Sequence, residues 1–478
     1  LMCTRSLSMA LGVLAGLFLL VGATASYGQT QTSITIKGTS GAGDATANEL
    51  GGDAGWRMIG SPVTGATLGD LTADVDNNGS VVEFGLASGA MFYGWDGSSG
   101  SWSAASSPNF SLENGMGYII FLFDDQGTAD AAPLNSNLAL TVDGGAVATG
   151  DDVTLNLPTD ANFHLIANPY DEDYGLESNL RGGTGGRVSR GNTDFSTVIQ
   201  IWNGGATTAE DNATAGTYCT FDLDTASSGS QIDVDYAGSC LGGDAEVVSS
   251  WQAFFLERQG SGNERVKFRS GGTTGSGSDD IVGDASSTGP GPGYVRMGLS
   301  LTVENQSGAE IARDEAASLY FHPEATTDED AFDASKLTPL TARYAVIGPV
   351  GPTGEGEAIK AQESRPLDQD LPMEIPLRFK TEGEVSGTAH LRAARWDGVP
   401  SDWTVTLVDT KGTPDPGDDE EYELTPSDST GYTFEVGSST QTEAALADSE
   451  PAPQRALPDQ LSLTEKALGN DDNVQTSA

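Results

Sequence analysis

Apolar and polar residues alternate with a period of two through most of the chain. The clearest example is the run from Val295 to Val303, in which every second residue is Val, Met or Leu. Shorter runs of the same kind lie at 153–157, 319–321, 375–379, 403–407 and 432–436. This is the period of β-strands, and the Gly, Asn, Asp and Ser clusters between the runs are typical of hairpin turns. No stretch after residue 30 keeps a helical period for three turns, so we expect an all-β protein with antiparallel strands.

A short phrase occurs twice. Residues 55–62 read GWRMIGSP and residues 162–169 read NFHLIANP, so that Phe163 follows Trp56 by 107 positions (163 − 56). Trp202 follows Trp95 by the same 107 positions (202 − 95). A spacing shared by two separate landmarks predicts tandem duplicated β-sandwich modules, followed by a third β-sandwich domain with the cleanest alternation.

The first residues have the features of a secretory signal. Arg5 precedes an apolar run from Met9 to Gly22, and small residues follow at Ala23–Ala25. We therefore expect a signal peptide at 1–28 and a mature chain without a transmembrane segment. The predicted boundaries that follow are β module one at 30–138, β module two at 139–270, a Gly/Ser/Pro linker at 271–293, domain three at 294–437 and a disordered acidic tail at 438–478.

The chain is strongly acidic. Asp and Glu number 69 against 23 Lys and Arg, a formal net charge of −46. Such a field repels phosphate, which excludes nucleic acid and anionic membranes as partners. The charge favours a salt-adapted protein over an ordinary secreted one, and we expect its stability to rise with added salt.

Two cysteines remain after the signal, Cys219 and Cys240. In an oxidising compartment they are expected to form a disulfide, worth on the order of 3 kcal/mol for a loop of about 20 residues. Both fall among turn-forming residues where module two carries extra sequence, which predicts a long loop closed by that bond. Residues 218–221, which include Cys219, have the pattern of a strand. A zinc site is not favoured, because two cysteines without a nearby histidine do not form a tetrahedral set.

A partial calcium motif lies in module one. Asp74, Asp76 and Asn78 match the first positions of a calcium-binding loop, but Gly85 stands where the bidentate Glu belongs. The interpretation we favour is an Asp/Asn-rich hairpin turn, with calcium binding as the alternative.

Catalytic motifs are missing from the sequence. The three histidines are scattered, and neither a Gly-x-Ser-x-Gly elbow nor a phosphate-binding Gly-rich loop occurs, so no catalytic residue is predicted. Trp102 and Trp251 lie near turn-rich segments and are candidates for stacking on sugars, although burial in a core explains the tryptophans of the repeated phrases better.

The two phrases at 55–62 and 162–169, together with residues 328–337, 374–377, 403–410 and 431–434, resemble large secreted surface proteins of Bacteroidota and halophilic relatives, the cargo of type nine secretion. The resemblance implies structural β-domains with no catalytic residues to carry over. The sorting domain usual in that family does not follow residues 455–463, so we expect the chain as read to stop short of it.

These observations predict an exported, non-enzymatic structural or adhesion protein of the cell surface or extracellular space of a salt-adapted bacterium. Its expected partners are envelope or extracellular glycans or proteins, and no cofactor is expected apart from the alternative of calcium. A carbohydrate-binding surface module is the second hypothesis, and a secreted hydrolase is the third.

Overall fold

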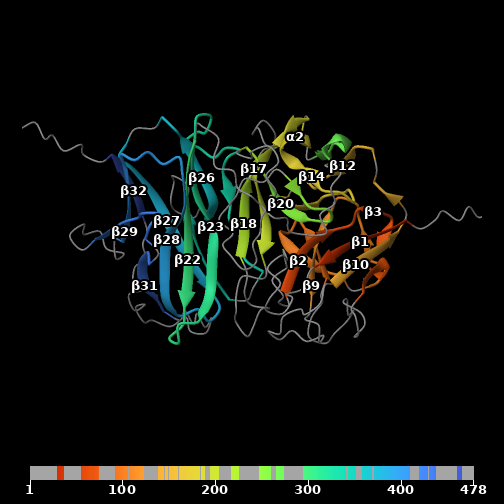
Figure 1. The fold of residues 1–478 in the computed structure, drawn as a ribbon, viewed down its shortest axis with the longest axis horizontal. Helices are drawn as coiled ribbons and strands as arrows, with labels where there is room; N and C mark the ends of the chain where they lie inside the picture. Colours follow the sequence, from red (N-terminus) through yellow and green to blue (C-terminus); the bar gives the residue numbers. More distant parts are fainter. Residues whose placement is uncertain are drawn as a thin grey trace, which may run out of the picture.

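Strands make up most of the structure. The computed structural model describes residues 30–36, 55–74, 92–105, 107–122, 138–144, 146–148, 150–159, 161–183, 185–188, 194–203, 217–224, 247–259, 265–273, 294–340, 343–350, 358–368, 371–409, 419–428, 430–437 and 460–465. The helical turns in these ranges are short: η1 (Leu68–Asp70), α2 (Leu176–Asn179) and η4 (Ser270–Gly272). The predicted all-β class is therefore confirmed (Figure 1). No helix within the described ranges is long and apolar enough to span a bilayer.

The N-terminal region, residues 30–148, contains two main sheets. One has the order β1-β10-β5 and the other the order β2-β9-β6-β7. Their strands are β1 (Thr30–Ile36), β2 (Gly55–Gly60), β5 (Leu71–Asp74), β6 (Phe92–Asp96), β7 (Ser101–Ala104), β9 (Gly117–Leu122) and β10 (Leu138–Gly144). Two short pairs complete the region, β3 (Val63–Thr64) with β11 (Ala146–Val147) and β4 (Ala66–Thr67) with β8 (Ser111–Leu112).

The predicted end of module one at 138 is wrong. Strand β10 begins at that residue and lies between β1 and β5, with hydrogen-bonded ladders to both. Strand β11 then pairs with β3. The alternation near 140 is too short to show which side it pairs with, so only the pairing assigns it to the N-terminal region.

The middle region, residues 150–273, also contains two main sheets. Its sheets have the orders β13-β20-β17-β18 and β12-β21-β15-β16. The strands are β12 (Val153–Asn156), β13 (Phe163–Ala167), β15 (Leu180–Gly182), β16 (Gly186–Arg187), β17 (Phe195–Asn203), β18 (Thr217–Asp222), β20 (Ala253–Arg258) and β21 (Arg265–Phe268), with β14 (Tyr174–Gly175) pairing β19 (Val247–Val248). The sheets β2-β9-β6-β7 and β13-β20-β17-β18 have the same strand order. In each, the strand that contains the repeated phrase (β2 or β13) pairs with the last strand of the sheet in sequence (β9 or β20), and the second and third strands follow.

The two regions meet through equivalent positions. Isolated bridges join Ile59 to Gln252 and Met116 to Ile166. Side chains from both regions form one apolar cluster between the sheets β2-β9-β6-β7 and β13-β20-β17-β18, including Met58, Ile119, Leu165, Trp202 and Phe255.

The C-terminal region, residues 294–465, has two larger sheets. The six-stranded sheet has the order β24-β26-β23-β22-β28-β31 and the five-stranded sheet the order β25-β27-β32-β29-β30. The strands are β22 (Val295–Glu304), β23 (Glu310–His322), β24 (Ala334–Ser335), β25 (Tyr344–Pro349), β26 (Lys360–Pro366), β27 (Met373–Glu382), β28 (Gly387–Asp397), β29 (Trp403–Asp409), β30 (Glu420–Glu423), β31 (Tyr432–Val436) and β32 (Gln460–Glu465). Alternating apolar residues of both sheets, such as Leu299, Ile347 and Leu391, form the core. Every alternating run predicted in 295–436 is thus a strand.

The predicted disordered tail needs a correction. Residues 460–465 form β32, which lies between β27 and β29 and pairs antiparallel with both. The alternation at 460–465 is only six residues long within a polar stretch, so no strand was predicted there. The open edges of β27 and β29 supply hydrogen-bond partners for its backbone groups.

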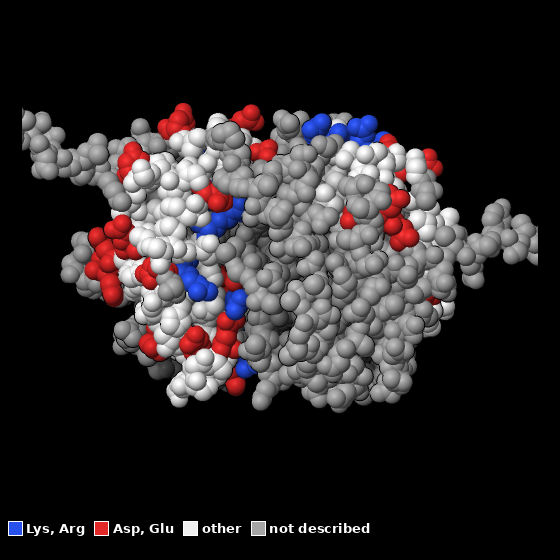
Figure 2. Space-filling model, viewed as in Figure 1, with Lys and Arg blue, Asp and Glu red and all other residues white. Residues whose placement is uncertain are grey.

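The C-terminal region packs against the middle region. Strands β18 and β23 lie side by side, and the Thr197 amide donates to the Ala331 carbonyl at 2.8 Å (Figure 1). Of the predicted linker, residues 274–293 lie outside the described residues, while Thr273 forms a bridge with Tyr174. Figure 2 shows acidic side chains scattered over the described surface of this face, with Lys and Arg in a few small groups.

Candidate functional site

A cavity of about 850 Å³ lies where the three regions meet. The N-terminal region contributes Trp56, Tyr93, Trp95, Trp102, Ile119 and the turn 97–101; the middle region contributes Asn162, Phe163, Tyr218 and Phe255; the C-terminal region contributes residues 336–340. We call this cavity the aromatic pocket. Its volume is in the range of small-molecule binding sites, and seven of the residues that line it are aromatic.

Strand alternation places the rings on one face. Trp56 and Met58 are two positions apart on β2, and Tyr93 and Trp95 are two positions apart on β6, so each pair points to the same side of the sheet. Strand β7 pairs Trp102 directly opposite Trp95. These rings are half-buried, because the end of the apolar cluster opens into the pocket.

Edge-to-face contacts hold the rings in position. The Trp95 ring lies 5.0 Å from Trp102 at an interplanar angle of 70° and 5.0 Å from Phe255 at 83°. Trp56 and Tyr93 make a similar contact at 5.6 Å. The Trp95 Nε1–H donates to the Phe163 carbonyl at 2.9 Å, which joins the N-terminal and middle regions at the wall of the pocket. A ring fixed in this way loses little further freedom when a ligand binds.

One rim of the pocket is a serine-rich turn. The Asp96 carboxylate accepts hydrogen bonds from the Ser98 amide at 3.1 Å, the Ser98 hydroxyl at 2.6 Å and the Ser99 hydroxyl at 2.8 Å. These bonds lower the pKa of Asp96. Ser99 Oγ also lies 2.6 Å from Ser101 Oγ. The carboxylate therefore shapes the turn, and the serines line the pocket.

The opposite wall comes from the C-terminal region. Leu337 is buried in the apolar cluster between the N-terminal and middle regions, and Leu340 packs on that cluster. The Lys336 ammonium does not serve the pocket, because it donates to Asp314 Oδ2 at 2.7 Å and to the Ile347 carbonyl at 2.6 Å inside the C-terminal region. Burial lowers the pKa of Lys336.

The pocket contrasts with the rest of the protein in charge. None of the described residues that line it is Asp or Glu, although the chain carries 69 of them. Its polar groups are hydroxyls and amides, such as Ser98, Asn162 and Thr338. The lining is suited to a neutral ligand with apolar faces and several hydroxyl groups.

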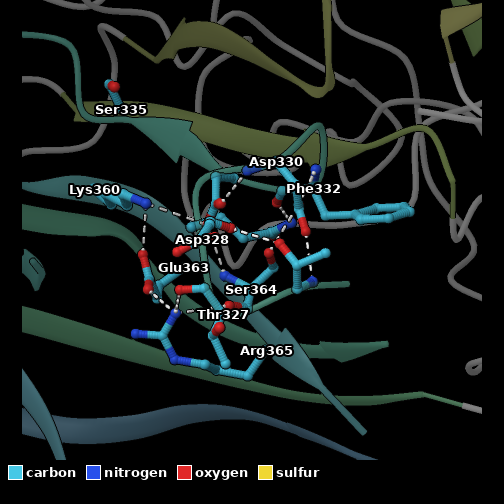
Figure 3. A network of polar contacts seen from close by, with 12 residues as sticks. Thr327, Asp328, Asp330, Phe332, Ser335, Lys360, Glu363, Ser364 and Arg365 are labelled. Carbon is cyan, nitrogen blue, oxygen red and sulfur yellow. Dashed lines mark hydrogen bonds and ion pairs between the residues drawn. The ribbon is translucent and has the colours of Figure 1, made fainter. Parts of the chain in front are cut away.

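A second cluster of polar residues lies between the middle and C-terminal regions. Lys360 Nζ is 2.8 Å from Glu363 Oε2 and 3.4 Å from Asp333 Oδ1, and Arg365 pairs with Glu363 (Figure 3). Burial raises the pKa of Asp333 to about 7. The Asp333 carboxylate also accepts from the Ser364 amide at 2.8 Å. These charges are packed against one another and against backbone, so we assign them to the contact between regions and not to a reaction centre.

The predicted site residues lie in different places. Trp102 lines the aromatic pocket. Trp251 is 1% exposed and lies in the core, so its ring is not available to stack on a sugar; its backbone has a positive φ of 63°. Cys219 is buried in β18, so the strand predicted at 218–221 is confirmed. Cys240 lies outside the described residues, so the disulfide stays a prediction. Asp74 is the last residue of β5, and Asp76 and Asn78 lie outside the described residues, so the calcium hypothesis also stays a prediction.

Sequence reasoning missed most of the pocket. Trp56 and Trp95 were assigned to the core because they fall at repeated positions, and residues 336–340 carry no motif. The available signal was the same-face spacing of two aromatic residues, Tyr93 and Trp95, on one strand. Among the described residues, no group of three His, Cys, Asp or Glu side chains is arranged to hold a metal ion.

Comparison with protein-family models, with curated proteins and with solved structures finds no match. The resemblance to type nine secretion cargo therefore stays a prediction, and the function must be argued from the pocket and from the arrangement of the three regions.

Proposed function

We propose that this chain is an exported, non-enzymatic protein of the cell surface or extracellular space that binds a neutral carbohydrate chain in the aromatic pocket. The observation that carries the proposal is the set of half-buried rings, in edge-to-face contact with one another, around a cavity lined by no Asp or Glu among the described residues. The negative face of an aromatic ring attracts the C–H bonds on the flat side of a sugar, and the serine hydroxyls of the rim can exchange hydrogen bonds with its hydroxyl groups.

The role of the whole protein is adhesion or structure outside the cell. The apolar run at 9–22 supports export, and the net charge of −46 supports solubility in high salt. The packed contacts between the three regions support a firm body that presents one binding site. The resemblance to secreted surface proteins points the same way.

The proposed architecture is a tandem duplication of one β-sandwich followed by a third sandwich. The support is the equal strand order of the sheets β2-β9-β6-β7 and β13-β20-β17-β18 and the matching place of the short pairs β4–β8 and β14–β19. Backbone conformation agrees as well: Gly115 and Trp251 both have positive φ, at 84° and 63°, and both stand two residues before the strand that pairs with the repeated phrase.

Binding to neutral oligosaccharides tests the proposal. A glycan array identifies the preferred sugar, and calorimetry then compares Trp102→Ala with wild type. We expect Trp102→Ala to weaken binding at least tenfold, about 1.4 kcal/mol, because it removes one stacking face. Trp403→Ala is the matched control, since Trp403 is also half-buried and makes an edge-to-face contact with Phe321 at 5.3 Å, far from the pocket.

Two outcomes would contradict the proposal. The wild-type protein binding no glycan would remove it, and so would equal affinities for the Trp102→Ala and Trp403→Ala proteins. Preference for apolar peptides over all glycans would instead assign the pocket to a protein partner.

A further inference from the structure

One wall of the aromatic pocket belongs to a region that is not part of the repeated sheets. Residues 336–340 come from the C-terminal region, and Leu337 and Leu340 contact the same apolar cluster as Trp102 and Tyr218. The pocket is therefore complete only when the C-terminal region is packed against the middle region.

The wall is tied to the C-terminal region. The Lys336 amide donates to the Ile359 carbonyl at 2.8 Å, and its ammonium is held by Asp314 and the Ile347 carbonyl. Because these partners are all in the C-terminal region, residues 336–340 move with it as one piece.

The residue before the wall contacts the middle region. The Ser335 amide donates to Glu257 Oε2 at 2.7 Å, and Gln200 Nε2 donates to the Ser335 carbonyl at 2.9 Å. Glu257 is two positions from Phe255 on β20, so the strand that carries a ring of the pocket also carries the carboxylate that holds the wall.

Apart from a small apolar cluster of Val198, Ala334 and Ala361, much of this contact is polar. Arg296 pairs with Asp222 at 2.7 Å, with side chains 2% and 1% exposed, and Gln362 Nε2 donates to the same Asp222 oxygen at 3.0 Å. The Asp333 carbonyl accepts from Ser196 Oγ at 2.8 Å and from Gln259 Nε2 at 3.0 Å. Contacts between regions of one chain generally allow the regions to move relative to one another unless the interface is large and apolar.

We propose that ligand binding in the aromatic pocket and packing of the C-terminal region onto the middle region are coupled, with Glu257 and Ser335 as the positioning contact. The inference rests on the proposed carbohydrate binding. A sugar chain that contacts both the pocket tryptophans (Trp56, Trp95 and Trp102) and residues 336–340 binds only the packed arrangement of the two regions. Binding therefore stabilises that arrangement. Coupling of this kind is reciprocal: weakening the contact lowers the affinity for the sugar, and the sugar strengthens the contact.

Glu257 offers a matched pair of variants outside the pocket lining. Glu257→Gln keeps an oxygen that accepts the Ser335 N–H, whereas Glu257→Ala removes it. With cellohexaose, xylohexaose and laminarihexaose as probes on the full chain, we expect Glu257→Ala to lower the affinity at least fivefold and Glu257→Gln to stay within twofold of wild type.

Amide hydrogen exchange supplies a second readout that a purely structural role for Glu257 would not change. The Thr197 and Ser335 amides both donate across the contact and lie outside the set of residues around the sugar-binding rings. We expect the bound probe to slow the exchange of both amides at least threefold in wild type and much less in Glu257→Ala.

The outcomes separate the two proposals. If wild type binds none of the probes or any arrayed glycan, the proposed function fails and the coupling falls with it. If wild type binds a probe while the Thr197 and Ser335 amides exchange at unchanged rates, or if Glu257→Ala binds as tightly as Glu257→Gln, carbohydrate binding stands and the coupling is overturned.

Discussion

Gly60 and Ala167 lie against each other where the N-terminal and middle regions meet. A Cβ atom on Gly60 would stand 2.1 Å from the Ala167 Cβ. The Gly60 amide donates to the Trp251 carbonyl at 2.7 Å, and the Ala167 amide donates to the Gly115 carbonyl at 2.9 Å. Each residue thus occupies in its own strand the position that the other occupies in the second strand, with room for only one methyl group between them.

Exchanging the methyl group between the two positions tests this arrangement. Gly60→Ala alone is expected to destabilise the protein by about 1–3 kcal/mol, because it forces two Cβ atoms together in a packed contact. Adding Ala167→Gly should restore most of the loss, measured as the urea denaturation midpoint.

Gly437→Ala is the control for the change itself, since a Cβ there meets no atom within 4 Å. A Gly60→Ala protein as stable as this control, or a double variant no more stable than the single one, would show that the two positions do not oppose each other.

At the scale of strands, the local alternation of apolar and polar residues predicted where strands occur but not which strands pair with each other. The alternation of 295–303 or 403–407 was sufficient for β22 and β29, because every second residue is buried in one continuous core. The pairing partners of β10 and β32 were not predicted, because these strands pair with the open edges of strands that are distant in sequence. The aromatic pocket was out of reach for the same reason: its rings come from three regions, and a ring at a repeated position looks the same whether the neighbouring region covers it or leaves it half open.

Strand β32 can be tested through its backbone. Ser462 pairs with Glu374 on one side and with Thr406 on the other. Ser462→Pro removes a hydrogen-bond donor from a strand with neighbours on both sides, and we expect a cost of about 1–3 kcal/mol, because a carbonyl of the neighbouring strand loses its partner. The Ser462→Ala protein should unfold near the wild-type midpoint in urea. Identical midpoints for the Pro and Ala proteins would restore the original prediction of a tail without structure.

At the scale of the whole molecule, two carboxyl groups with raised pKa lie at the contact between the middle and C-terminal regions. Burial raises the pKa of Glu257 to about 7, and the nearby Glu329 and Asp333 carboxylates add to the effect. Asp333 itself has a pKa of about 7, again through burial. In the unfolded chain both groups titrate near pH 4.

This shift predicts a stability that falls as the pH rises. Between pH 4.5 and 7 the folded protein binds a proton at Glu257 that the unfolded chain has lost, so the free energy of unfolding declines with pH across this interval and levels above pH 7. The decline from Glu257 is of the order of 3 kcal/mol, at 1.36 kcal/mol for each pKa unit.

His164 acts in the opposite direction, because burial lowers its pKa to about 4 and acid therefore destabilises the fold. The difference in stability between wild type and Glu257→Gln isolates the Glu257 contribution, measured by urea unfolding at pH 5 and pH 8. We expect the free energy of unfolding of Glu257→Gln to be closer to, or above, that of wild type at pH 8 than at pH 5. A difference that does not change with pH would show that Glu257 is ionised throughout.

The distance in sequence between the two walls of the aromatic pocket has a consequence during synthesis. Trp56 and Leu340 are 284 positions apart (340 − 56), which a ribosome covers in about 15–60 s. During that interval the pocket tryptophans are exposed, because residues 336–340 have not yet been synthesised. Exposed apolar surface of this kind binds chaperones and promotes aggregation. Conditions that slow elongation beyond residue 270 should therefore lower the yield of folded protein more than pauses placed near the end of the chain.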